Sequence, residues 1–348
     1  ASSSLRRRLL QGIGLALCGP VALAQPGGKA RRVGIVFSTD PRTSAPYLDA
    51  LARGLEQHGY RRDRDFVVDV RHAEGRPERY PALVRELLDA RAEVLVVGAN
   101  SGVIAAKAAT STVPIVMAGA LAPDAMGLVA SLARPGGNVT GVANMSGSVT
   151  AKRLQLLHEL VPGATRIAYL ANPAVPGWDR TVKTVEDAGA AMALRISTAT
   201  ASTPEEIDRM LASLAEQRPD AILVGNALLF WMHRRRIIDF CARHRIPAGY
   251  AHGEVVREGG LTSYSSSLED TFRMAGTFVA RILGGAKPAD LPVEQPTRYE
   301  LFVNATTAKA LGILIPAAIR ANAEIVESAP AASRDVVRCA AALAHPRL

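Results

Sequence analysis

Small polar side chains recur in this chain directly after short apolar runs, where they could bind a ligand or take part in catalysis. The apolar run at 33–37 is followed by Ser38-Thr39-Asp40, and the run at 94–97 leads into Asn100-Ser101. Hydroxyl and amide groups both donate and accept hydrogen bonds, so a group of them can hold a polar small molecule. Catalysis would need a nucleophile beside a base, and the sequence offers no convincing pair. The pattern therefore predicts a ligand-binding site and no catalytic residue.

The candidate ligand-binding residues are Ser38, Thr39, Asp40, Asn100, Ser101, Gly119, Asn144, Ser146, Asn172, Asn226, Tyr250 and Tyr264. The two tyrosines are included because an aromatic ring can cover an apolar or aromatic ligand. Taken singly, each of the others could be an ordinary helix cap or turn residue. If Asn100 and Ser101 cap a helix that points at the ligand, they favour a carboxylate, since a helix N-terminus attracts anions.

Several kinds of site are excluded by the motifs. No G-x-G-x-x-G follows the first strand, and the chain contains neither a P-loop nor a G-x-S-x-G elbow, so no nucleotide cofactor is expected. The histidines form no tight ligand pair, so no metal is expected either. His252-Gly253-Glu254 is interpreted as a group of solvated loop residues, although acid–base chemistry there remains an alternative.

The elements that must position these residues alternate regularly along the chain. Short β-branched runs predict strands, and leucines at helical spacing predict helices between them. The predicted strands cover 33–37, 66–70, 94–97, 114–117, 139–142, 166–170, 193–197, 221–224 and 246–250. Strands joined by helices form parallel sheets, and ligands bind beyond the carboxyl ends of such strands. The alternation of strands and helices begins again after the Pro135-Gly136-Gly137 turn, which predicts a second unit. We therefore expect an α/β protein with two Rossmann-like lobes and a cleft between them.

The charge of the chain is concentrated in its terminal segments. The chain has 348 residues, of which 48% are hydrophobic and 21% charged, and its net charge is +9. Residues 1–24 and 25–32 carry +3 each, and the segment from Ala329 carries +2, which leaves +1 for residues 33–328. A nearly neutral body argues against a nucleic-acid partner.

The first 24 residues have the form of a secretory signal. Arg6-Arg7-Arg8 is followed by a short apolar stretch and by Ala22-Leu23-Ala24, an A-x-A cleavage site. We expect cleavage after about Ala24 and a periplasmic protein, by either ordinary or twin-arginine export. Cys18 would leave with the signal, and Cys241 is predicted to be a buried small hydrophobic residue.

Four ordered segments resemble one known family. They are Leu132–Val142, His233–Ala248, Glu258–Tyr264 and Leu291–Gly312. Together they resemble the ABC transporter substrate-binding proteins that include tryptophan- and tyrosine-binding members. The resemblance covers about 32–328. It implies a type I periplasmic-binding-protein fold, whose multi-strand hinge has three strands, with an ABC permease and its ATPase subunits as partners.

The resemblance also implies lobe boundaries. The N-terminal lobe would be 32–143 plus 261–286, and the C-terminal lobe 144–260 plus 298–328. Residues 329–348 have no counterpart and are expected to form a disordered tail. Two departures fall near the expected cleft, because Ala99-Asn100 and Ser265-Ser266 stand where the family has Thr/Ser-Pro and Gly-Pro. A ligand other than an aromatic amino acid is therefore expected.

Three functional hypotheses follow. The first is a periplasmic solute-binding protein of an ABC import system that captures a small molecule, such as an amino acid or related carboxylate, by hinge closure. The second is a periplasmic sensor that presents its ligand-bound form to a signalling receptor. The third is an exported α/β hydrolase. The first two share a fold, so the sequence does not separate them.

Overall fold

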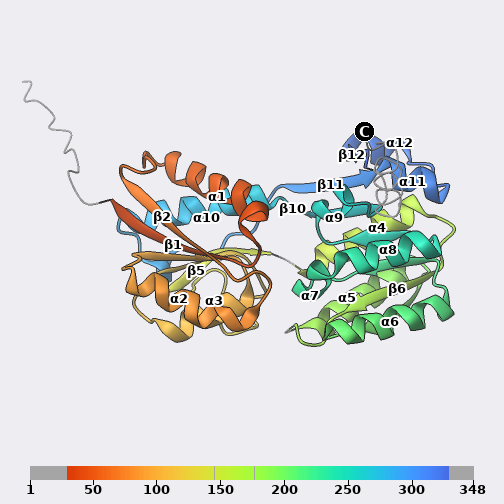
Figure 1. The fold of residues 1–348 in the computed structure, drawn as a ribbon, viewed down its shortest axis with the longest axis horizontal. Helices are drawn as coiled ribbons and strands as arrows, with labels where there is room; N and C mark the ends of the chain where they lie inside the picture. Colours follow the sequence, from red (N-terminus) through yellow and green to blue (C-terminus); the bar gives the residue numbers. More distant parts are fainter. Residues whose placement is uncertain (1–29, 145, 176, 329–348) are drawn as a thin grey trace, which may run out of the picture.

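Two lobes lie side by side along the long axis of the molecule, and each is built around its own β-sheet (Figure 1). The structure is a computed structural model that describes residues 30–144, 146–175 and 177–328. The expected signal at 1–24, its cleavage after Ala24 and the expected tail at 329–348 lie outside the described residues. The predicted α/β class, with two sheets in which parallel pairing dominates, is confirmed.

The first lobe contains a five-stranded parallel sheet in the order β2-β1-β3-β4-β5. Its strands are β1 (Arg31–Phe37), β2 (Phe66–His72), β3 (Val94–Val97), β4 (Ile115–Leu121) and β5 (Val139–Asn144). Helices α1 (Pro41–Glu56) and α10 (Leu268–Leu283) cover one face, and α2 (Tyr80–Asp89) and α3 (Asn100–Ala109) cover the other (Figure 1). Because both faces are covered, β1 and β3 are continuous apolar runs without alternation.

Helices α1 and α10 approach each other closely although they are far apart in sequence. Gly54 in α1 faces Gly276 in α10, and a Cβ added at Gly54 would lie 2.0 Å from the Arg273 carbonyl oxygen. Only glycine leaves room for two helix backbones at this distance. This contact fixes α10 to the first lobe, although the segment before it belongs to the second.

The second lobe contains a seven-stranded sheet in the order β12-β11-β10-β9-β8-β6-β7. Its strands are β6 (Arg166–Ala171), β7 (Arg195–Thr200), β8 (Ala221–Val224), β9 (Ala248–Tyr250), β10 (Thr262–Ser266), β11 (Tyr299–Asn304) and β12 (Glu324–Val326). Its helices are α4 (Ser146–Leu160), α5 (Trp178–Ala191), α6 (Pro204–Gln217), α7 (Leu228–Met232), α8 (Arg234–His244), α9 (Gly253–Arg257), α11 (Ala305–Leu311) and α12 (Ala317–Asn322). Helices α4 and α5 pack on one face, and α6 and α8 on the other.

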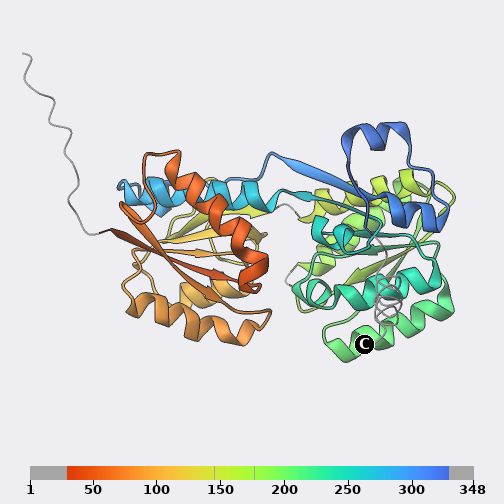
Figure 2. The same cartoon turned by 45° about the horizontal axis from the view of Figure 1, so that its top comes forward.

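The chain passes between the lobes at three places that together form the hinge. The crossings lie between β5 and α4, between β10 and α10, and in the segment that leads from Glu294 into β11 (Figure 2). Ser266 Oγ donates a hydrogen bond to Asn144 Oδ1 at 3.1 Å, which ties the first two crossings together. Val142 forms a parallel bridge with Glu294, which ties the third to the first.

The observed sheets place one segment differently from the sequence-based division. Residues 261–286 were expected in the first lobe, but β10 pairs with β9 and β11 in the sheet of the second lobe. Only α10 packs in the first lobe, so the chain crosses at about 266–268. The reason is that β10 pairs antiparallel with β11, which begins in the third crossing. Pairing between strands that lie far apart along the chain leaves no local sequence pattern.

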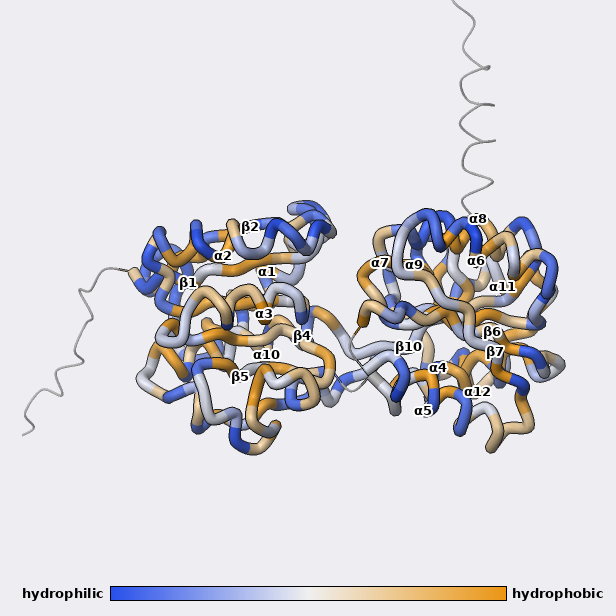
Figure 3. The backbone as a smooth tube through the Cα atoms, turned by 90° about the horizontal axis from the view of Figure 1, so that it is seen from below, coloured by the Kyte–Doolittle hydropathy of each residue, from blue (hydrophilic) through white to orange (hydrophobic). Residues whose placement is uncertain are grey.

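Apolar residues fill the interior of each lobe and hydrophilic ones lie at the periphery (Figure 3). Cys241 is 6% exposed in this interior, so its predicted role as a buried small hydrophobic residue is confirmed. In the described part of the chain, no helix combines the length and the apolar character needed to cross a membrane.

Candidate functional site

A cleft of about 600 Å³ opens between the lobes at the carboxyl ends of the strands; we call it the main cleft. Its volume is within the range of small-molecule sites. The predicted residues among its lining are Ser38, Thr39, Asn100, Ser101, Gly119, Asn144, Asn172 and Asn226. The structure thus brings these residues together from both lobes and the hinge, and their contact with a ligand stays a prediction.

Two smaller hollows adjoin the main cleft. A side pocket of about 420 Å³ extends beside α5 and is lined by Trp178, Arg180 and Asp124. A recess of about 30 Å³, here called the hinge recess, lies where β5, α4 and β10 meet. Leu121, Asn144 and Asn226 line all three hollows, so the hollows adjoin one another.

Asp40 caps a helix and is not among the residues found to line the main cleft. Its Oδ1 accepts hydrogen bonds from the backbone N–H groups of Arg42 (3.0 Å) and Thr43 (3.1 Å), and Thr43 Oγ1 donates to Oδ2 at 2.7 Å. These bonds, that from the Thr43 side chain first, lower the pKa of Asp40. The N-terminus of α1 thus uses the carboxylate of Asp40, whose contact with a ligand stays a prediction.

Asn100 is also engaged with the backbone, and it does not cap α3. Its Nδ2 donates to the Leu121 carbonyl oxygen at 2.9 Å, and its Oδ1 accepts from the Leu121 N–H at 2.8 Å. The capping position of α3 is Ala99, which has no polar side chain. The first N–H groups of α3 therefore stay available at the main cleft, where they favour an anionic group.

Aromatic rings face the main cleft from both lobes. In the first lobe Tyr47 stacks on Phe272 with ring centroids 5.5 Å apart, and Phe37 lies 5.2 Å from Phe272. In the second lobe Trp231 has the Arg234 guanidinium 4.5 Å from its ring centroid and meets His252 edge-on at 4.9 Å. Rings on opposite walls suit a ligand with an apolar or planar body.

His252 is a cleft residue, although the sequence favoured a solvated loop. Its Nε2 lies 3.1 Å from Asn226 Oδ1, which can only accept, so Nε2 carries the hydrogen. Burial lowers the pKa of His252 to about 4, against the opposing charge of Glu254 and with help from Arg153 and Arg234. The imidazole is therefore neutral at neutral pH, and Asn226 Nδ2 remains available as a donor.

The two predicted tyrosines lie elsewhere. Tyr250 is 2% exposed in the core of the second lobe, and burial raises its pKa well above the usual value. Tyr264 stacks on Tyr299 at 5.5 Å and packs against the other face of that sheet. Side chains alternate across a sheet and these two point into packed layers, so neither is among the residues that line the three hollows, and their contact with a ligand stays a prediction. Ser146 is the first residue of α4, and its contact with a ligand stays a prediction.

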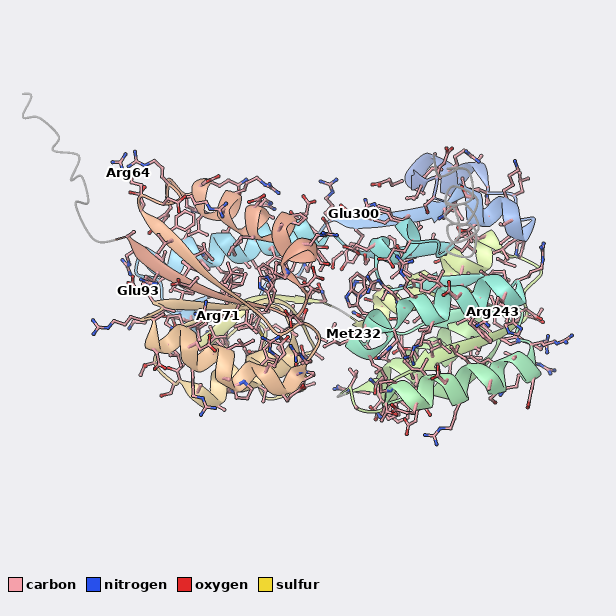
Figure 4. The ribbon with its side chains drawn as sticks, in the orientation of Figure 1. Arg64, Arg71, Glu93, Met232, Arg243 and Glu300 are labelled. Carbon is pink, nitrogen blue, oxygen red and sulfur yellow. The ribbon has the colours of Figure 1, made fainter. Side chains whose placement is uncertain are left out.

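Contacts between the lobes bridge the main cleft at two points. The Tyr47 hydroxyl of α1 donates a hydrogen bond to Glu254 Oε1 of α9. Gly75 of the first lobe packs against Met232, which lies at the edge of the second lobe that faces the first (Figure 4). The main cleft is thus bounded by the hinge and by these two bridges.

Arg153 is a buried site residue that the sequence prediction missed. It is 3% exposed on α4, lines the hinge recess, and donates from Nε to the Tyr264 carbonyl oxygen at 3.1 Å. A signal was present, because Thr150, Arg153 and Leu157 share the helical spacing of a buried stripe. An arginine in such a stripe needs a polar environment.

Comparisons with known proteins agree with this geometry. The family described as ABC transporter substrate binding protein matches residues 35–327. A tyrosine-binding protein of Clostridioides difficile (strain R20291) is 24% identical over 270 residues, which are 76% of this chain and 77% of that protein.

Solved structures show the same fold. An ABC domain from Streptococcus pneumonia in complex with L-Trp has a TM-score of 0.78 at 23% identity, over 86% of this chain and 100% of its own. A ligand-free, open substrate-binding protein with adhesive properties from Clostridium difficile has a TM-score of 0.68 at 21% identity, over 86% and 100%. A LacI-family regulator from Bifidobacterium animalis has a TM-score of 0.53 at 16% identity, over 79% and 96%. The architecture is that of type I periplasmic-binding proteins.

Proposed function

The chain belongs to the ABC transporter substrate-binding protein family, and on that premise we propose that it captures a small carboxylate-bearing solute in the main cleft and delivers it to the permease and ATPase subunits of an importer. The observation that carries the proposal is the main cleft itself. Polar residues that follow strands of both lobes line this cleft, and three chain crossings allow the lobes to rotate toward each other. Hinge closure around a solute is the expected response of such an arrangement.

The lining supports a ligand with an anionic end and an apolar body. The free N–H groups of α3 suit a hydrogen-bond-accepting group, and the rings of Phe272 and Trp231 suit an apolar or aromatic group. The similar tyrosine-binding protein and the similar ABC domain in complex with L-Trp support a ligand about as large as an aromatic amino acid. We propose that the solute is an amino acid or a related carboxylate.

We propose that the protein makes and breaks no covalent bond. Membership of a family of binding proteins supports this role. The alternatives, a ligand sensor and a hydrolase, are not favoured by that membership.

We also propose that the protein is exported. Substrate-binding proteins of ABC importers work outside the cytoplasmic membrane, and the residues up to Ala24 have the form of a signal. N-terminal sequencing of the protein from a periplasmic extract should begin at Gln25. A mature chain that retains Arg6-Arg7-Arg8 would contradict cleavage.

A solute screen tests the proposed capture. Thermal shift across amino acids, organic acids, amines and amides should give hits that raise the melting temperature, because a ligand that binds only the folded state stabilises it. Small-angle X-ray scattering with a hit should show a smaller radius of gyration. An absence of hits in every class, together with unchanged scattering, would contradict the proposal.

A further inference from the structure

Arg153 lies in the hinge, and no described residue forms an ion pair with it. Its Nη1 is buried and has no hydrogen-bond partner among the described residues. Burial lowers the pKa of Arg153 to about 10, and the group that opposes this effect is Tyr169 rather than a carboxylate. The side chain is therefore charged at neutral pH in a place that water scarcely reaches. A buried cation of this kind is unfavourable unless an anion joins it.

The hinge recess beside Arg153 has the size and the lining of an anion pocket. Besides Arg153 it is lined by Asn144, Asn226, His252, Ser265 and Ser266. These side chains can supply amide and hydroxyl donors. The volume of about 30 Å³ suits a small group such as a carboxylate, so the rest of a larger ligand would lie in the main cleft, which shares Leu121, Asn144, Asn226, His252 and Leu268 with the recess.

The same surfaces offer no partner for an ammonium group. Among the described residues that line the hinge recess and the main cleft, none carries a carboxylate. Glu254, which acts electrostatically on His252, is already bonded to the Tyr47 hydroxyl. Asp124 lines the side pocket, where Arg180 is also present. An amino acid bound with its carboxylate at Arg153 would bury its ammonium group without an acid to pair with it.

We propose that Arg153 receives the carboxylate of the transported solute, and that this solute is an apolar or aromatic organic acid without an ammonium group beside the carboxylate. The proposal rests on the proposed function and names its substrate class. Arg153 also holds the carbonyl oxygen of Tyr264 in the hinge strand β10, and Asn144 and Ser266 belong to two of the crossings. A carboxylate in the hinge recess therefore contacts the segments that bend when the lobes close.

The first test uses the wild-type protein and four compounds that share one skeleton. They are 3-phenylpropionate, L-phenylalanine, 3-phenylpropionamide and 3-phenylpropylamine, and the set is repeated with indole and branched-alkyl skeletons. Calorimetry should show a carboxylate that binds at least roughly 10-fold more tightly than its amino acid, with no binding of the amide or amine. An amino acid or amide that binds as tightly as its carboxylate, or a set in which no carboxylate binds, would overturn the proposal.

The second test removes the cation. Arg153→Gln keeps a donor for the Tyr264 carbonyl oxygen and should weaken carboxylate binding by roughly 100-fold, whereas Arg153→Lys should fall between wild type and Arg153→Gln. Lys152→Gln is the matched control, since it removes a positive charge one position earlier in α4 and Lys152 is not among the lining residues. It should bind within about 2-fold of wild type. Equal binding by Arg153→Gln and wild type would overturn the assignment.

The two tests separate this proposal from solute capture in general. The ligand-free Arg153→Gln variant should melt no lower than wild type, because it removes an unpaired buried charge, and the compound series needs no variant at all. If amino acids or neutral compounds bind as tightly as the carboxylates and compact the protein, solute capture stands and the proposed substrate class is wrong. If no compound of any charge class binds, both are wrong.

Discussion

Neighbouring backbone groups decide what each polar side chain of the cleft can do. Asp40 and Asn100 both follow buried strands, yet backbone N–H groups bond to their oxygens, so Asp40 caps α1 and Asn100 holds the backbone of Leu121. The buried Nη1 of Arg153 has no hydrogen-bond partner among the described residues, and His252 bonds the oxygen of Asn226 and leaves its amide nitrogen available. The residues available for recognition are thus those that the fold leaves incompletely bonded.

Asn100 should matter more for stability than for recognition. Asn100→Ala leaves the N–H and carbonyl oxygen of Leu121 without their partner, so the free energy of unfolding should fall by about 1–3 kcal/mol in urea denaturation. Asn322→Ala is the control, because its exposed amide bonds one carbonyl on its own helix, and it should change stability by less than about 0.5 kcal/mol. Equal stability of the two variants would show that the Leu121 bonds contribute little.

His252 should make stability depend on pH. Its pKa is about 4 when folded, below the ordinary value of 6.5, so the unfolded chain binds more protons between these values. The His252 contribution to stability is complete above pH 6.5 and is lost as the pH falls toward 4. The difference in melting temperature between wild type and His252→Asn should shrink over this range, while exposed His58→Asn should follow wild type. A difference that does not vary with pH would contradict the assignment.

At the scale of elements, the close contact between α1 and α10 should limit substitution. Gly54→Ala places a methyl group against the backbone of α10, and it should destabilise the protein by about 1–3 kcal/mol in chemical denaturation. Gly163→Ala, at a turn where an added Cβ meets nothing within 4 Å, should be neutral or stabilise by up to about 1 kcal/mol. Equal effects of the two changes on stability would contradict the close contact between α1 and α10.

Helices and strands with a regular pattern of apolar residues could be predicted from the sequence. Very short elements, and strands that pair with distant segments, could not. The apolar run of β3 and the capped start of α6 both agree with expectation. Helix α9 and strand β12 have only five and three residues, too short for a repeat, and β10 joins its sheet through pairing with a distant strand.

The sequence could predict that residues at the ends of strands line the site, but it could not predict where each side chain points. Asn144, Asn172 and Asn226 line the main cleft as expected. Tyr250 ends a strand as well, but its ring points into the core, and His252, two residues further on, lines the cleft. Arg153 comes from the middle of a helix, where a rule about strand ends does not apply.

At the scale of the whole molecule, the bond between Tyr47 and Glu254 should bias how far the lobes open. Burial and the Glu254 carboxylate raise the pKa of Tyr47 well above its usual value, so the phenol remains a donor. Tyr47→Phe should enlarge the ligand-free radius of gyration in X-ray scattering and weaken solute binding by roughly 10-fold, because a hydrogen bond to a charged group that joins the two lobes is lost. Tyr60→Phe, a change within the first lobe, should alter neither. Wild-type behaviour of Tyr47→Phe would show that this bond does not hold the lobes.

The central claim is that a carboxylate solute binds between the lobes and draws them together. A crystal structure of the protein with the tightest carboxylate found by calorimetry tests it most directly. The carboxylate should lie within about 3 Å of the Arg153 guanidinium, with the apolar body between the rings of the two walls and the lobes rotated toward each other about the three crossings. A solute bound outside the adjoining hollows, or one bound between lobes that have not moved, would contradict it.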